Sequence, residues 1–194
     1  MSNGRMLLGI GVGWLREEFE AIGADFDTRA KRTDEYVLAL RALWEQEAPT
    51  FSGDFVSFKE AYCRPQPVNG SVPIIIGGHS PASARRAGRL GDGFFPARGV
   101  SQELIQIVHE TARANNRDPK DIEITASIPE SLDDIPKLVD LGVGEGRLPA
   151  AQCRAGGGRA RRPGEARDEE VHEAVLQPAV VRRVDMRLAE LLHV

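Results

Sequence analysis

The turn Gly77-Gly78-His79-Ser80 combines residue types that suit the binding of an anion. Glycine has no side chain, so the main chain can approach a ligand closely, and N–H groups at the start of a helix attract negative charge. Ser80 precedes Pro81, a favoured first residue of a helix, and can therefore cap that helix or bind a phosphate. The pattern supports two interpretations: a phosphate site, or a plain strand-to-helix turn whose glycines serve only its geometry. His79 fits either a ligand contact or a position facing solvent.

A second glycine turn, Gly11-Val12-Gly13-Trp14, follows the apolar run of residues 6–12. Its glycines have the same two interpretations. Taken alone, Trp14 predicts a core or interface residue, and a place in a ligand cleft is the alternative.

The elements that must position these turns alternate along the chain. Continuous apolar runs predict strands buried on both faces, and apolar residues at helical spacing predict amphipathic helices between them. A short hairpin is predicted in residues 50–64. This rhythm predicts an α/β fold with a parallel sheet, but periodicity alone does not distinguish a closed barrel from an open doubly wound sheet. We expect strands over 6–12, 72–76, 92–96 and 121–126, helices over 14–22, 28–46, 81–90, 101–116 and 131–141, and a further strand starting at 142–143.

Three expectations concern individual side chains. Helical spacing in residues 28–46 predicts a buried stripe made of Tyr36, Leu40, Leu43 and Trp44. A solvated helix face is the simplest interpretation of Arg85, Arg86 and Arg89. Asp92, at the start of a strand, favours a structural role over a catalytic one.

Composition and charge limit the functions open to the chain. The formal net charge of −4 argues against general nucleic-acid binding. No apolar segment approaches the roughly 20 residues needed to span a bilayer, and no signal peptide is evident, so we expect a cytoplasmic protein. The four histidines show no metal-ligand spacing. Cys63 and Cys153 favour reduced thiols, with a disulfide left open.

The chain changes character after Val143. Residues 144–194 contain no Ile, Phe, Tyr, Trp or Lys but nine Arg. We therefore expect one domain over residues 1–143 and an atypical Arg/Gly/Ala-rich tail over 144–194. One hypothesis is a frameshift near codon 143, since GC-rich DNA translated out of frame yields this composition. The alternative is a natural disordered tail with a short helix. Re-sequencing the gene and searching its other frames would decide between them.

Several segments in this order and spacing resemble the luciferase-like monooxygenase superfamily, in particular its branch that depends on coenzyme F420. They are residues 11–19, 29–36, 51–55 and 73–96, and the resemblance covers about residues 3–143. It implies a partial TIM (β/α)8 barrel, about strands four to seven with their helices, plus a small hairpin insertion. It also implies a chain truncated at both ends.

The resemblance further implies a cofactor and a reaction. The cofactor is coenzyme F420, a deazaflavin, with FMN as the alternative, and the reaction is hydride transfer or O₂-dependent monooxygenation of a small organic substrate. The residues matching the family's cofactor cleft are Gly11, Gly13, Trp14, Gly77, Gly78, His79 and Ser80. Residues around the reactive ring come largely from the family's first three strands, so no catalytic residue is named. A homodimer is compatible with this assignment, and the alternatives are an inactive barrel fragment and a generic nucleotide-binding module.

Overall fold

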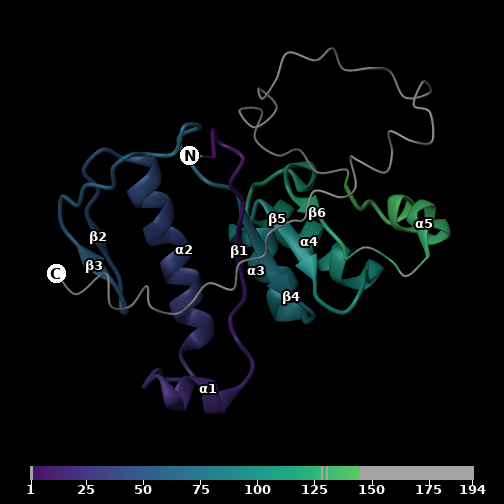
Figure 1. Cartoon of the computed structure of the whole chain (residues 1–194), viewed down its shortest axis with the longest axis horizontal. Coiled ribbons are helices and arrows are strands. Elements are labelled where there is room, and N and C mark those ends of the chain that lie inside the picture. Colours follow the sequence, from purple (N-terminus) through teal and green to yellow (C-terminus); the bar gives the residue numbers. More distant parts are fainter. Residues whose placement is uncertain (1, 128, 130, 145–194) are drawn as a thin grey trace. The chain divides into compact units, whose positions relative to one another are not determined.

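Four parallel strands form one sheet in the part of the chain that the structure describes, which is residues 2–127, 129 and 131–144 of a computed structural model (Figure 1). These residues belong to the first of two units, Met1–Cys153 and Arg154–Val194. The strand order is β1-β4-β5-β6. The bounds are β1 Leu8–Ile10, β4 Ile74–Gly78, β5 Gly93–Pro96 and β6 Glu123–Ile124. Strands that follow one another in the strand–helix rhythm are also neighbours in the sheet, so the predicted parallel α/β arrangement is confirmed.

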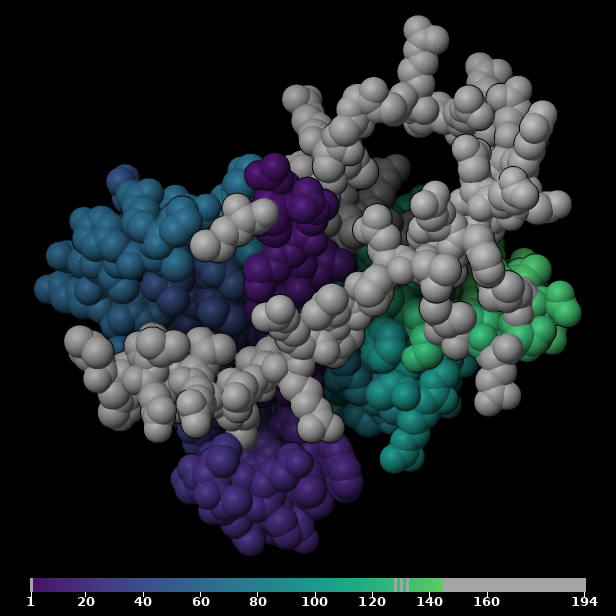
Figure 2. Space-filling view, in the orientation of Figure 1, coloured from purple at the N-terminus to yellow at the C-terminus, as the bar shows by residue number. Residues whose placement is uncertain are grey.

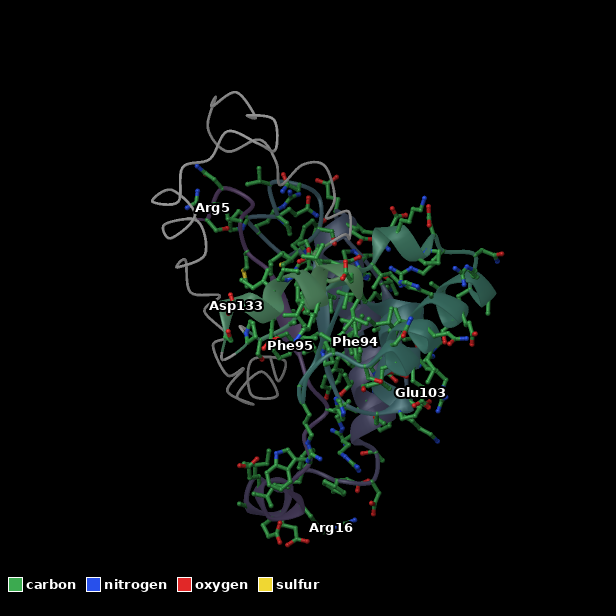
Figure 3. The ribbon with its side chains drawn as sticks, turned by 90° about the vertical axis from the view of Figure 1, so that its right-hand side faces the viewer. Arg5, Arg16, Phe94, Phe95, Glu103 and Asp133 are labelled. Carbon is green, nitrogen blue, oxygen red and sulfur yellow. The ribbon has the colours of Figure 1, made fainter. Side chains whose placement is uncertain are left out.

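The two faces of this sheet differ in what covers them. One face carries the core residues Ile74, Ile76, Phe94 and Ile124, which pack with residues of α3 (Pro81–Leu90) and α4 (Gln102–Ala114). Side chains alternate along a strand, so the residues between these point to the opposite face, called the inner face below. Figure 3 shows Phe94 on the side of α4, which carries Glu103, and Phe95 on the other side.

A partly buried ion-pair network joins α2 (Arg29–Glu45) to α3. The side chain of Arg86 is only 7% exposed, and its Nε donates to a carboxylate oxygen of Asp34. Arg89 donates to the other oxygen of Asp34 at 2.7 Å. The prediction of a solvated face is therefore wrong for Arg86, because α3 turns this side chain toward α2, where Asp34 replaces water. Arg85 is exposed, as predicted.

The residues around β1 are more exposed than a doubly buried strand would be. Leu8 and Ile10 are half-buried, Met6 is 52% exposed and Leu7 is 46% exposed. Figure 2 shows the N-terminal residues, coloured purple, at the surface. The prediction of a strand buried on both faces is wrong here, because β4 is its only partner strand among the described residues.

The buried stripe of α2 also differs from the prediction. Val37 and Ala39 are buried. Trp44 is partly buried and packs against the core, but the helix enters that core through Val37 rather than through Tyr36. The stripe is therefore rotated around the helix from the predicted one, whose members Tyr36, Leu40, Leu43 and Trp44 are all only half-buried.

The predicted hairpin is present and is attached to α2. Strands β2 (Phe51–Ser52) and β3 (Ser57–Phe58) pair antiparallel, and the rings of Phe51 and Phe58 stack at 5.7 Å. At its tip, the main-chain N–H groups of residues 54, 55 and 56 donate to the carboxylate of Glu35 at 2.7–2.9 Å. Phe19 of α1 (Arg16–Ala21), the helix before α2, is buried.

The last described elements follow α4. They are η1 (Pro119–Asp121), β6, η2 (Leu132–Asp134) and α5 (Ile135–Asp140), so the helix expected over 131–141 starts as a 3₁₀ turn and is shorter. No strand forms at 142–143 among the described residues, although the N–H of Gly144 donates to Ile124 of β6 at 2.9 Å. The frameshift and tail hypotheses concern residues 144–194, of which only Gly144 is described. No described helix has the length and apolar character required to cross a membrane.

Candidate functional site

The sheet brings the two glycine turns together. Ile10 of β1 pairs with Ile76 of β4, so Gly11 and Gly77 follow side by side at the carboxyl end of the sheet. On the other side of β4, Gly78 pairs with Pro96, and the N–H of Ala97 donates to the carbonyl of Gly78 at 3.1 Å. The carboxyl ends of parallel strands are where α/β barrels place their ligand sites.

Ser80 caps α3, as predicted. Its hydroxyl accepts from the N–H of Ser83 at 3.2 Å, and the hydroxyl of Ser83 accepts from the N–H of Ser80 at 3.0 Å. This reciprocal capping box uses the N–H of Ser80 inside the protein. Pro81 has no N–H, so the N–H of Ala82 is the donor of the first turn left without a partner inside the helix. The anion-binding capacity of this turn therefore rests on Ala82, on the exposed His79 and on the helix dipole.

Gly78 and Gly13 are required by the fold itself. Gly78 has a φ of +152°, and a Cβ there would lie 2.6 Å from the Cβ of Ser83. Gly13 has a φ of +78°, and a Cβ there would lie 2.7 Å from the ring of Phe19. Both contacts are too short for a real side chain. These two glycines are therefore explained by turn geometry without a ligand.

Gly11 and Gly77 have no such explanation. Neither has a positive φ. A Cβ on Gly11 would meet nothing within 4 Å, and one on Gly77 would meet only the carbonyl oxygen of Ile10 at 3.6 Å, an ordinary contact. The described fold would accept alanine at either position. Among the described residues, Gly11 therefore faces open space at the carboxyl end of β1, and Gly77 could take a Cβ in ordinary contact with Ile10.

Trp14 does not belong to the core. Its side chain is 82% exposed, so the interpretation of Trp14 as a core residue is wrong. Gly13 turns the chain just before α1, and Trp14 projects from that turn instead of packing with Phe19. Its exposure is compatible with a role at the mouth of a ligand cleft.

Sequence reasoning overlooked two inner-face residues beside the glycine turns, Phe95 and Thr125. Phe95 pairs with Gly77, and it is half-buried where its neighbour Phe94 is fully buried. Thr125 follows β6, and its N–H donates to the carbonyl of Phe94 at 3.0 Å. The alternation of a strand could have found Phe95, because Phe94 and Phe95 must face opposite sides of the sheet.

Electrostatics adds one ionisable group to the inner face. Glu123 pairs with Gly93 and is half-buried, and burial raises the pKa of its carboxyl above the usual value. The residues that the structure describes contain no group of three or more His, Cys, Asp or Glu side chains able to hold a metal ion.

A parallel sheet with helices on one face and glycine turns at its carboxyl edge is the arrangement found in segments of α/β barrels. The chain belongs to the luciferase-like monooxygenase family, whose sequence pattern matches residues 1–170. The match extends into the segment after Val143.

Relatives within this family use two cofactors. The chain is 38% identical over 117 residues to the FMNH(2)-dependent dimethylsulfone monooxygenase of Pseudomonas fluorescens strain Pf0-1. This match covers 59% of this chain and 32% of that protein. The chain is 35% identical over 144 residues to the F420-dependent glucose-6-phosphate dehydrogenase of Mycobacterium avium strain 104, and this match covers 70% of this chain and 43% of that protein. The chain thus spans less than half of the length of both relatives.

Solved structures confirm the fold. The monooxygenase RslO1 from Streptomyces bottropensis superposes with a TM-score of 0.56 at 27% identity, covering 73% of this chain and 46% of that one. An F420-dependent secondary alcohol dehydrogenase, in complex with an F420-acetone adduct, superposes with a TM-score of 0.55 at 25% identity. This match covers 71% of this chain and 45% of that one. The described residues therefore form part of the family's barrel, as predicted.

Proposed function

We propose that the carboxyl edge of β1, β4 and β5 forms part of a cofactor site for a flavin or deazaflavin, in an oxidoreductase of this family. The cofactor is coenzyme F420, with FMN as the alternative. The substrate is a small organic molecule, and the reaction is hydride transfer or O₂-dependent monooxygenation. The residues proposed to line the cofactor are Gly11, Gly13, Trp14, Gly77, Gly78, His79 and Ser80.

One observation carries this proposal: a Cβ on Gly11 would meet nothing within 4 Å, and one on Gly77 would meet only the carbonyl oxygen of Ile10, at 3.6 Å. A Cβ at either position would be accepted by the described fold but would occupy space at the edge where the two turns meet. The residues present therefore fit a group that approaches the main chain closely. One relative is named as FMNH(2)-dependent and another as F420-dependent, so we propose that this group is a flavin or a deazaflavin.

The turn of residues 77–80 is proposed to hold the cofactor's phosphate. Gly78 brings the chain close to α3, and the capping box with Ser83 fixes the first turn of this helix. The N–H of Ala82 and the positive end of the helix dipole then favour an anion. His79 is exposed beside them and supplies a further donor.

Chemistry at the reactive ring comes from the cofactor: a bound deazaflavin supplies hydride transfer, and a reduced flavin supplies activation of O₂. The chain's own contribution is to bind and orient. The main chain at Gly11 and Gly77 admits the ligand, and the capped α3 fixes the position of its charged end. No described side chain is assigned as an acid or a base.

The phosphate site is tested by titrating the full chain with FMN and with riboflavin, which lacks the phosphate. We expect FMN to bind more tightly, and the His79→Ala variant to lose up to about tenfold of FMN affinity, since one charge-assisted hydrogen bond contributes about 1.5 kcal/mol. Riboflavin affinity should not change. His109→Ala, on α4, serves as the histidine control. Equal affinity for FMN and riboflavin in the wild-type chain would contradict the phosphate site.

The two cofactors are separated by a parallel titration with coenzyme F420. Tighter binding of F420 than of FMN supports a deazaflavin enzyme, and the reverse order supports an FMN monooxygenase. A chain that melts without cooperativity and binds neither supports the alternative, a barrel fragment without catalysis. We further propose that the protein acts in the cytoplasm. We also propose that it forms a homodimer, which sedimentation of the purified chain would test.

A further inference from the structure

Phe19 is the one buried residue of helix α1, which lies beside the start of α2 (Figure 1). Its ring lies against the main chain of Gly13, where a Cβ would come within 2.7 Å of the ring. Gly13 directly precedes Trp14, whose side chain is 82% exposed and therefore has little packing of its own. The position of Trp14 thus depends on what holds the ring of Phe19.

The ring of Phe26, in the connection between α1 and α2, contacts the ring of Phe19. The two rings meet edge to face, with their centres 5.2 Å apart and their planes at 89°. Aromatic pairs favour this geometry, because the positive edge of one ring meets the negative face of the other. Phe26 is itself only half-buried, so other groups must hold it in place.

Two arginines lie over the ring of Phe26. The guanidinium carbon of Arg29, at the start of α2, is 3.6 Å from the ring centre, and that of Arg16, at the start of α1, is 4.4 Å from it. Arg29 also donates from Nη1 to the carbonyl of Phe26 at 2.7 Å, which fixes the guanidinium and the ring relative to each other. Arg16 pairs with Asp27 at 2.8 Å.

Arg29 differs from Arg16 in its partners. Among the described residues it has no carboxylate within ion-pair distance, and its buried Nε has no hydrogen-bond acceptor. A cation over an aromatic face is attracted by the ring, and more strongly where water is excluded. The ring and the carbonyl of Phe26 are therefore the groups that hold this guanidinium, and the guanidinium in turn holds the ring.

We propose that Arg29 is a positioning residue for the cofactor site. It holds Phe26, Phe26 holds Phe19, and the ring of Phe19 fixes the turn at Gly13 from which Trp14 projects. This inference rests on the proposed function, in which Trp14 lines the cofactor, and adds to it a residue that does not touch the cofactor. We call Phe19, Phe26 and Arg29 the stacked cluster. Removing the guanidinium loosens the turn and leaves every group that faces the ligand unchanged.

The test measures the mobility of Trp14 directly. The chain has two tryptophans, so Trp44→Phe leaves Trp14 as the only one, and each variant is made in the full chain on that background. Time-resolved fluorescence anisotropy reports the motion of Trp14, and quenching of FMN fluorescence reports the affinity for FMN. Arg29→Met keeps an unbranched side chain without the guanidinium. We expect it to speed the anisotropy decay of Trp14 and to lower FMN affinity about threefold, as the loss of one cation–π contact predicts.

Arg41→Met is the matched control, because it is the same substitution in the same helix. Arg41 pairs with Asp92 at the other end of α2. This variant should lower the melting temperature but leave the motion of Trp14 and the affinity for FMN unchanged, so the readouts separate positioning from a general loss of stability. If Arg29→Met lacks a cooperative melt, Arg29→Lys replaces it, since lysine keeps the charge but not the flat group that stacks.

The outcomes separate the stacked cluster from the proposed function. Unchanged motion of Trp14 in the folded Arg29 variant overturns the positioning role and leaves the proposed function standing. Faster motion of Trp14 with undiminished FMN affinity also overturns that role, because the position of Trp14 then does not matter for the cofactor. Failure of the wild-type chain to bind FMN and F420 overturns both.

Discussion

The carboxylate of Asp92 accepts a hydrogen bond from the guanidinium of Arg41 at 2.8 Å, and thereby joins the start of β5 to α2. The same carboxylate oxygen accepts from the N–H of Ile74, at the start of β4, also at 2.8 Å. Arg41 donates in addition to the carbonyl of Leu90 at the end of α3. Asp92 and Arg41 thus together connect β4, β5, α2 and the end of α3 at the end of the sheet opposite the glycine turns, as expected of Asp92 as a structural rather than a catalytic residue.

Replacing Asp92 should destabilise the fold. Asp92→Ala leaves the Ile74 N–H without its acceptor and removes the carboxylate that pairs with the Arg41 guanidinium, and both groups are partly buried, so we expect a loss of about 2–3 kcal/mol of unfolding free energy. Urea denaturation measures this. The control is Glu47→Ala, which removes an exposed ion pair with Arg64 and should cost below about 0.5 kcal/mol. Equal effects of the two variants would show that the Asp92 network contributes nothing beyond an ordinary surface pair.

Attachment of the hairpin to α2 should weaken in acid. Burial acts to raise the pKa of Glu35, but the N–H groups of residues 55, 56 and 54 and the charge of Arg32 outweigh it and lower the pKa below the ordinary value of 4.5. A lowered folded pKa means that the carboxylate stabilises the protein above pH 4.5 and that this contribution is lost as the pH falls through the folded pKa. The melting temperature of wild type should therefore fall more steeply below pH 4.5 than that of Glu35→Gln. Glu17→Gln, at the exposed start of α1, should follow wild type, and parallel curves for all three proteins would refute the role of Glu35.

Sequence patterns predicted the parallel α/β arrangement because each strand and helix carries its own local pattern. The apolar run before Gly77, the cap at Ser80 and the stop at Gly91 are all local, and α3 has the predicted bounds. What failed depends on distant partners. Arg86 is buried because Asp34, 52 residues away, neutralises it, and no periodicity within α3 records that contact.

For the candidate site, the position of the two glycine turns beside each other was predictable from the sequence, but the role of each glycine was not. Strand order brings Gly11 beside Gly77, and a resemblance to a barrel family already implies that order. The sequence alone could not distinguish the glycines that the fold requires from those that it does not require. Gly78 and Gly13 are distinguished from Gly11 and Gly77 only by main-chain angles and by the atoms that a Cβ would meet.

This division predicts opposite effects of the same substitution. Gly78→Ala forces a Cβ to within 2.6 Å of Ser83 at a φ of +152°, so it should cost about 1–3 kcal/mol of stability. Gly11→Ala meets no atom and restricts the unfolded chain, so it should be neutral or stabilise by up to about 1 kcal/mol. Thermal unfolding of the two variants beside wild type measures both. A destabilised Gly11→Ala would mean that the fold, and not a ligand, requires that glycine.

The carboxyl of Glu123 on the inner face should lower stability at neutral pH. Burial raises its pKa, so the charged form is less favourable in the folded protein than in the unfolded chain. For an acid with a raised folded pKa, the folded state binds the proton more tightly, and stability declines as the pH rises from the unfolded to the folded pKa. Glu123→Gln removes this effect, so its melting temperature should exceed that of wild type at pH 7, and the difference should shrink toward pH 4. Glu103→Gln, on the exposed start of α4, is the control and should show no such change with pH. A Glu123→Gln variant less stable than wild type at pH 7 would instead mean that the carboxylate is charged and held by a cationic partner.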